Sequence, residues 1–222
     1  MKLNQFYPQR CFVCGYHVAP DDFPICIRCI ARMQRLLSER CINCNKPASS
    51  CICEDKTRCL FFYKSITSKI LIHRFKYRAD RRILRFVAQM LIETTGVNPK
   101  RFDAITYVPR LPRNERKSGY DQSKWFAKAI SEVYGIPILD TMVRKGGKDQ
   151  KMLSREERIK NIRGRYKPKN APTEKYNHLL LIDDVQTTGA TLEACAKVLR
   201  EHFANRVTKA CIAKTIVPKK KL

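Results

Sequence analysis

The segment HLLLIDDVQTTGATL, from His178 to Leu192, contains the strongest structural signal in this chain. Its apolar run LLLI is short and continuous, which is typical of a strand buried in a parallel sheet. Asp183 and Asp184 follow the run directly, and the letters QTTG then form a small polar turn. From Ala190 onward, apolar residues recur at helical spacing. The segment therefore predicts a strand, an acidic pair, a loop and a helix, in that order.

This order of elements predicts an anion site beside a hydroxyl site. Ligands of open α/β sheets bind outside the carboxyl ends of the strands, and a helix N-terminus offers unpaired N–H groups to an anion. Backbone amides and threonine hydroxyls between Thr187 and Thr191 can hold one phosphate, while the neighbouring carboxylates would repel a second. Carboxylates accept hydrogen bonds from a cis-diol, so the pair of sites suits a 5-phosphorylated ribose. Neither GxxxxGK[ST] nor GxGxxG occurs in the chain.

The run LLLIDDVQTTGAT resembles the phosphoribosyl pyrophosphate (PRPP) motif of type I phosphoribosyltransferases. The resemblance implies an α/β fold with an open, mainly parallel sheet flanked by helices, and it implies PRPP bound together with magnesium. It assigns Asp183 and Asp184 to the ribose hydroxyls as catalytic residues. Arg110, in the strand and loop DAITYVPRLP, becomes the charged contact for pyrophosphate. The remaining PRPP ligands that it implies are Gln186, Thr187, Thr188, Gly189, Ala190 and Thr191.

The amino-acid composition indicates which binding partners and which cellular compartment to expect. The 222 residues leave room for one main domain and a small appendage. Forty-five Lys and Arg stand against 20 Asp and Glu, a formal net charge of +25, which favours a polyanionic partner such as nucleic acid, anionic lipid or a phosphorylated substrate. The first residues contain no apolar core of a signal peptide, and no stretch approaches the length of a membrane span. We therefore expect a soluble, cytoplasmic protein.

Eight of the eleven cysteines form close pairs near the N-terminus. Each pair lies on a short turn that can direct two thiolates at one ion, and two pairs complete a tetrahedral Cys₄ zinc site. A disulfide network is the competing interpretation, but nothing else in the chain indicates secretion. Four sulfur ligands leave no position for water, so structural zinc is expected. Sequential pairing gives one zinc to Cys11, Cys14, Cys26 and Cys29 and another to Cys41, Cys44, Cys51 and Cys53, and a crossed arrangement is the alternative.

The order VPRLP, RKSGYDQ, LSREERIKNIRGRY and DDVQTTG is similar to the ComF family, whose members carry an N-terminal zinc region ahead of a phosphoribosyltransferase domain. The resemblance implies a double zinc-ribbon-like region at 1–58 and a phosphoribosyltransferase-like domain at 59–222. It also makes Lys117, in the basic loop RKSGYDQ, a candidate catalytic residue. Family members usually have RGFNQ here, so the chain departs from the pattern in this loop.

The ComF resemblance also implies a link to DNA uptake and natural transformation, with single-stranded DNA, a competence helicase and a second copy of the chain as candidate partners. It does not indicate the acceptor of a transfer reaction. Two alternatives stay open: a non-catalytic accessory that binds single-stranded DNA and retains the ribose-phosphate site, and a zinc-containing interaction module with an inactive transferase domain. The basic stretches 73–82 and 144–169 contact nucleic acid or phosphate in one interpretation and are solvated faces in the other.

Overall fold

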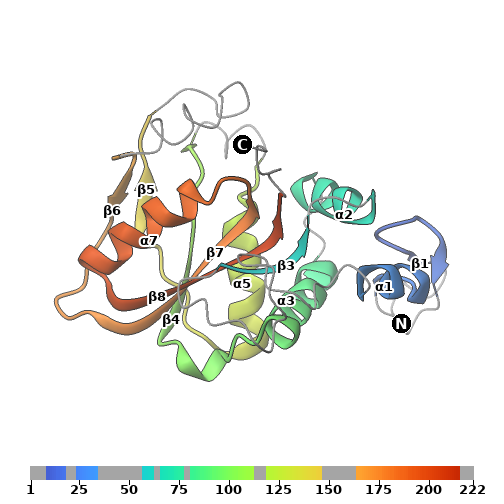
Figure 1. Ribbon diagram of the computed structural model, residues 1–222, viewed down its shortest axis with the longest axis horizontal. Coiled ribbons are helices and arrows are strands. Elements are labelled where there is room, and N and C mark those ends of the chain that lie inside the picture. The colour runs from blue at the N-terminus through green and yellow to red at the C-terminus, as the bar shows by residue number, and fades with distance from the viewer. Residues whose placement is uncertain are drawn as a thin grey trace, which may run out of the picture.

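A computed structural model describes residues 9–18, 24–34, 57–62, 66–77, 81–112, 119–146 and 164–215. Helices flank both faces of a central sheet, and a small cysteine-containing unit lies at the N-terminal end (Figure 1). The elements are β1 Gln9–Arg10, β2 His17–Val18, α1 Ile27–Gln34, β3 Arg58–Phe62, α2 Ile66–Tyr77, α3 Arg81–Thr95, the 3₁₀ turn η3 Pro99–Arg101, β4 Ala104–Tyr107, α5 Gln122–Tyr134, β5 Met142–Arg144, β6 Tyr166–Pro168, β7 Tyr176–Gln186, α7 Ala190–His202 and β8 Ala204–Lys214.

The central sheet has the strand order β3-β8-β7-β4, and every neighbouring pair in it is parallel. Ile105 in β4 also forms a parallel bridge with Ile138, beside the outer edge of β4. The strands β5 and β6 form a separate antiparallel hairpin. Because the long strands are parallel, their carboxyl ends meet along one edge, where β4 ends at Tyr107 and β7 at Gln186. The expected open, mainly parallel sheet flanked by helices is confirmed.

Alternation along β7 divides the core into two layers. Leu180 and Ile182 belong to the cluster that includes buried residues of α2, α3 and α5. Leu179 and Leu181 belong to the cluster that includes α7 and the β5–β6 hairpin. Successive side chains of a strand point to opposite faces, so an apolar run buries both faces of the sheet at once. This explains why LLLI reads as continuous rather than alternating.

The strand β7 is longer than the apolar run predicts. It continues through the acidic pair to Gln186, because its backbone stays in register with β8, where Gln186 is paired with Lys214. The assignment of Gln186 to the turn is therefore wrong, since it is the last strand residue. The predicted helix beginning at Ala190 is confirmed as α7. The predicted helix ending at Gly135 is confirmed as α5, with Gly135 in the left-handed conformation at its C-terminus (φ 68°).

The N-terminal unit packs onto the main core. Phe12, Val13 and Ile25 are buried in the same cluster as the residues of α2. The guanidinium of Arg74 in α2 donates a hydrogen bond to the Phe12 carbonyl oxygen at 2.6 Å. The domain boundary at residue 58 stays a prediction.

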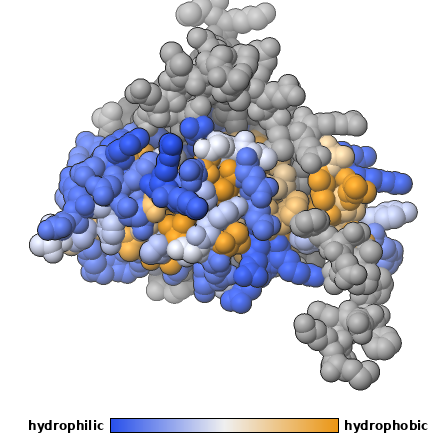
Figure 2. Space-filling view, turned by 90° about the horizontal axis from the view of Figure 1, so that it is seen from below, coloured by the Kyte–Doolittle hydropathy of each residue, from blue (hydrophilic) through white to orange (hydrophobic). Residues whose placement is uncertain are grey.

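In the described parts of the chain, no helix has the length and apolar character needed to cross a bilayer. The face in Figure 2 is mostly hydrophilic and carries separate hydrophobic patches.

Candidate functional site

The acidic pair lies at the carboxyl end of β7. Asp183 is only 8% exposed, whereas Asp184 is half-buried. Burial raises the pKa of Asp183 well above its usual range, and the charge of Asp184 acts in the same direction. Two donors partly oppose this rise: the Asp184 N–H and the Ser123 hydroxyl contact Asp183 Oδ1 at 2.9 and 3.0 Å. Asp184 in turn accepts from the Val185 N–H at 2.6 Å. Both carboxylates are therefore oriented by the surrounding backbone and by α5.

The loop after β7 leads directly into α7. Gly189 has a left-handed backbone (φ 81°) and is the N-cap of the helix. Thr188 Oγ1 accepts a hydrogen bond from the Ala190 N–H at 3.3 Å. Helical geometry leaves the amides of the first turn without intrahelical acceptors, and the macrodipole favours negative charge there. The residues from Thr187 to Thr191 thus form a turn that can hold an anion.

Two contacts from Thr215 hold the loop between β7 and α7 in place. The Thr215 N–H, directly after β8, donates to the Gln186 carbonyl oxygen at 2.9 Å, and the Thr215 hydroxyl contacts the Thr187 carbonyl oxygen at 3.3 Å. The side chain of Gln186 lies against the turn. If residue 189 carried a Cβ atom, that atom would be 2.7 Å from Gln186 Nε2. The Cys59 thiol lies 3.6 Å from Gln186 Oε1. Gln186 therefore lies against the loop through its side chain, and the left-handed backbone at residue 189 favours glycine.

Arg110 lies in the loop after β4, at the same edge of the sheet. Its backbone N–H donates to Asp121 Oδ2 at 3.3 Å, and its guanidinium donates to the Tyr120 carbonyl oxygen at 3.0 Å. Asp121 also caps α5 by accepting from the Lys124 N–H at 3.1 Å. The N-terminus of α5 is therefore linked to the Arg110 loop through Asp121, and to the acidic pair through Ser123.

A cavity of about 170 Å³ opens beside Arg110, and basic side chains dominate its charge. Two aspartates also line it: Asp121, and Asp140, which is paired with Lys169 at 2.5 Å. The cations that line the cavity are Arg110, Lys124, Arg144 and Lys169. Such a charge balance favours an anionic ligand.

Sequence reasoning overlooked Asp121 and Ser123. The position of Asp121 just before a helix is a detectable N-cap signal, but nothing in the sequence marks Ser123 as a partner of Asp183. The candidate Lys117 lies outside the described residues.

The first four cysteines converge as sequential pairing predicts. The sulfur atoms of Cys11, Cys14, Cys26 and Cys29 all lie within 4.8 Å of one another. Tetrahedral zinc with Zn–S bonds of about 2.3 Å needs sulfur atoms roughly 4 Å apart, so the group fits one ion. The N–H groups of Val13 and Cys26 contact the Cys11 sulfur at 3.4 and 3.3 Å. Cys41, Cys44, Cys51 and Cys53, the expected second set, lie outside the described residues.

The two buried thiols of this group titrate differently. Burial raises the pKa of Cys11, but backbone N–H contacts from Cys14, Cys26 and Val13 outweigh it and lower the pKa to about 7. Burial raises the pKa of Cys29, and contacts with Cys14 and Cys26 add to the rise. A cation bound at the centre of the group would stabilise both thiolates. The group can therefore hold a zinc-type metal.

The other three described cysteines, Cys59, Cys195 and Cys211, are buried thiols. Cys195 in α7 is buried in the same cluster as Leu179 and Leu181, and Cys59 and Cys211 are register partners on β3 and β8. The sulfur atoms of Cys59 and Cys211 lie 2.6 Å apart. Burial raises the pKa of both Cys195 and Cys211, so these groups stay protonated at neutral pH.

The parallel sheet, the acidic pair at the end of β7 and the Gly-containing turn into α7 have the arrangement that the resemblance to type I phosphoribosyltransferases implies. Solved structures similar to the chain include the allosteric regulatory enzyme of purine biosynthesis, with 18% identity, a TM-score of 0.40 and coverage of 64% of this chain but only 30% of that one. Purine phosphoribosyltransferase from Pyrococcus horikoshii has 19% identity and a TM-score of 0.34, covering 65% of this chain and 73% of its own.

Sequence relatives cover nearly the whole chain. Competence protein F of Haemophilus influenzae is 28% identical, over 90% of this chain and 94% of that protein. Competence protein ComFC of Bacillus subtilis is 25% identical over 82% and 80%, respectively. The DNA utilization protein YhgH of Salmonella typhimurium is 26% identical over 94% and 98%. These relatives confirm the resemblance to the ComF family. No family model matches the chain.

Proposed function

We propose that the chain is a ComF-like protein that binds PRPP with magnesium at residues 183–191. The observation that carries this proposal is the placement of a buried, oriented carboxylate, Asp183, one short turn before the N-terminus of α7. Asp183 and Asp184 accept hydrogen bonds from the ribose hydroxyls. The amides and hydroxyls from Thr187 to Thr191 hold the 5-phosphate.

The residues at the ends of β4 and β7 would divide the work of phosphoribosyl transfer. A nucleophile attacks C1 of the ribose while pyrophosphate leaves, and positive charge develops on the sugar ring. In this proposal Asp183 and Asp184 stabilise this charge, and Arg110 contacts the leaving pyrophosphate. Lys117, which lies outside the described residues, stays a candidate from the resemblance for the same contact. Magnesium, when bound, neutralises charge on the pyrophosphate. We assign no residue to binding of the nucleophile that accepts the phosphoribosyl group.

The raised pKa of Asp183 couples ligand binding to protons. Ribose hydroxyls that donate to Asp183 favour its charged form, so binding releases a proton wherever the free carboxyl is protonated. PRPP affinity should therefore increase as pH rises through the pKa of Asp183 in the free protein, and should decline on acidification.

Isothermal titration of the zinc-loaded protein with PRPP and magnesium tests the proposal. The wild type should bind, and an Asp183→Asn, Asp184→Asn variant should lose binding because the diol acceptors are gone. Glu201→Gln is the matched control, since it removes an exposed carboxylate at the far end of α7. If a folded wild type gives no heat at millimolar PRPP, the proposed ligand is wrong.

A second candidate function is a contact with single-stranded DNA during DNA uptake. The formal net charge of +25 favours it, and the relatives named above are competence and DNA utilization proteins. Binding through phosphates should weaken steeply with salt, since each neutralised phosphate of a single strand contributes about −0.7 to the log–log slope. Salt-insensitive or absent binding would exclude this function. A competence helicase as partner stays a prediction from the resemblance.

For the cysteine group we propose a structural zinc on Cys11, Cys14, Cys26 and Cys29. Four thiolates leave no coordination position for a reacting water, so the ion would stabilise the fold and take no part in catalysis. A second zinc on the later cysteines follows from their spacing alone.

A further inference from the structure

The β5–β6 hairpin lies against the layer that contains α7. Arg144 and Tyr166 are direct partners across this antiparallel pair, so their side chains share one face. Met142 and Tyr166 on that face are buried with Leu181 of β7 and Leu192 in the first turn of α7. The hairpin therefore brings Arg144 and Tyr166 to the place where β7 leads into α7.

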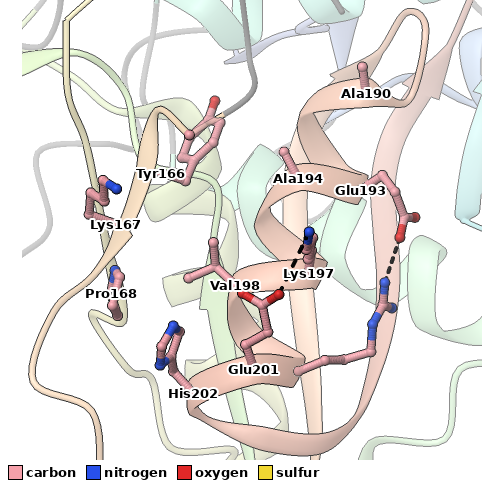
Figure 3. Close-up of a pocket in the computed structure, with 12 residues that line it drawn as sticks. Tyr166, Lys167, Pro168, Ala190, Glu193, Ala194, Lys197, Val198, Glu201 and His202 are labelled. Atoms are coloured by element: carbon pink, nitrogen blue, oxygen red, sulfur yellow. Dashed lines mark hydrogen bonds and ion pairs between the residues drawn. The ribbon is translucent and has the colours of Figure 1, made fainter.

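Tyr166 presents a buried hydroxyl beside the start of α7. The residue is 4% exposed, and no described residue forms a hydrogen bond with its hydroxyl oxygen. Figure 3 shows the ring beside α7, with the oxygen directed toward the helix end that carries Ala190. Burial raises the pKa of Tyr166, Cys195 and Asp183 add to the rise, and Arg144 and the Thr191 side chain oppose it. The phenol therefore lies near Asp183 and near the Thr191 side chain.

Arg144 lies beside Tyr166 on the same face of the hairpin. Its guanidinium carbon is 5.8 Å from the centre of the Tyr166 ring, and its Nε is a buried donor for which the described residues offer no acceptor. Arg144 also lines the cavity of about 170 Å³ beside Arg110. The side chain is thus a half-buried cation beside the Tyr166 ring and the cavity that Arg110 lines.

Two polar atoms on one face of this hairpin have no partner among the described residues, and this needs an explanation. A buried donor without an acceptor costs free energy, and native structures contain few of them. One anionic group with several oxygen atoms, such as a phosphate, bound at the start of α7 would accept hydrogen bonds from both Tyr166 and Arg144. The Glu193 carboxylate in the first turn of α7 already engages Lys209 and Arg200, so the charge of a phosphate dianion bound there would need a cation from another element.

We propose that Arg144 and Tyr166 are ligand-binding residues that donate to the 5-phosphate of a phosphorylated ribose. This inference rests on the proposed function and deepens it, because it assigns the hairpin to the phosphate end of the ligand. Tyr166 supplies a neutral donor, and Arg144 supplies the compensating charge. The site then selects phosphorylated ribose over free ribose.

Titration of the zinc-loaded full chain with ribose 5-phosphate tests this assignment. Loss of one hydrogen bond to a charged group lowers affinity by roughly ten- to a hundredfold, so Tyr166→Phe and Arg144→Gln should each weaken binding on this scale. Tyr166→Phe should leave pyrophosphate affinity unchanged, because the hydroxyl faces the start of α7. Tyr176→Phe, at the opposite end of β7, is the matched control and should bind like the wild type.

A thermal melt separates a binding role from a structural one. Tyr166→Phe keeps the ring and removes only a hydroxyl without a described partner, so its midpoint should equal or exceed that of the wild type. Unchanged ribose 5-phosphate affinity in both hairpin variants, or an equal loss of pyrophosphate affinity in Tyr166→Phe, overturns the inference and leaves the proposed function intact. A folded wild type that binds neither ribose 5-phosphate nor PRPP overturns both.

Discussion

The Ser123 hydroxyl donates a hydrogen bond to Asp183 Oδ1 at 3.0 Å and thereby joins the first turn of α5 to the end of β7. Ser123→Ala removes one of the donors that favour the charged form of Asp183, so the pKa of Asp183 should rise further. We expect a loss of about 1–3 kcal/mol of stability at neutral pH in urea denaturation, together with weaker PRPP binding. Ser131→Ala on the same helix is the control, and equal effects of the two variants would refute the role of Ser123.

Asp183 should reduce the stability of the free protein at neutral pH. Its pKa in the folded state lies above the usual value of about 4, so the folded state binds more protons than the unfolded state between these two values. Stability therefore falls as pH rises through this window. Asp183→Asn should melt at a higher temperature than the wild type near pH 7, and the difference should disappear below about pH 4. A variant that melts lower at pH 7 would show that the carboxylate is well compensated.

Glu193 anchors α7 to the sheet. Its carboxylate contacts the buried ammonium of Lys209 at 2.7 Å and the guanidinium of Arg200 at 2.5 Å. Although burial raises the pKa of Glu193, these two cations outweigh it and lower the pKa, so the stabilisation is present at neutral pH and is lost on acidification through the folded-state value.

Glu193→Gln should cost about 1–3 kcal/mol in urea denaturation at pH 7, less than a fully buried pair because the Glu193 side chain is half exposed. Glu201→Gln, whose exposed partner is Lys197, should cost well under 1 kcal/mol. Equal costs at pH 7 would contradict the anchoring role, and so would a Glu193→Gln effect that persists below the pKa of the carboxyl.

Removal of one cysteine of the metal group should release the metal and loosen the N-terminal unit. Cys29 is buried among residues that pack with α2, so Cys29→Ser should lower both metal content and thermal stability. Elemental analysis of the purified protein gives the zinc content directly. Cys195→Ala, a buried thiol outside the group, should retain the full zinc content. Unchanged zinc in Cys29→Ser would exclude this residue as a ligand.

Local pattern was sufficient to predict the central unit of the fold. The LLLI run, the acidic pair and the helical spacing from Ala190 are short-range features, and the structure confirms the strand and the helix that they predict. The position of Gln186 was predicted wrongly because pairing with β8 extends the strand beyond its apolar residues. The convergence of Cys11, Cys14, Cys26 and Cys29 followed from CxxC spacing alone.

Contacts between distant segments had no signal in the sequence. The pairing of Arg144 with Tyr166 depends on a hairpin whose strands are more than twenty residues apart, in a stretch that reads simply as basic. The contact of Ser123 with Asp183 depends on how α5 packs against β7. Such contacts arise from tertiary packing, which propensity and periodicity do not encode.

A crystal structure of the protein soaked with ribose 5-phosphate tests the central claim most directly. We expect the phosphate at the amides from Thr187 to Thr191 and the ribose hydroxyls within hydrogen-bonding distance of Asp183 and Asp184. Ligand density elsewhere on the molecule, or an empty turn at a saturating concentration confirmed in solution, would contradict it.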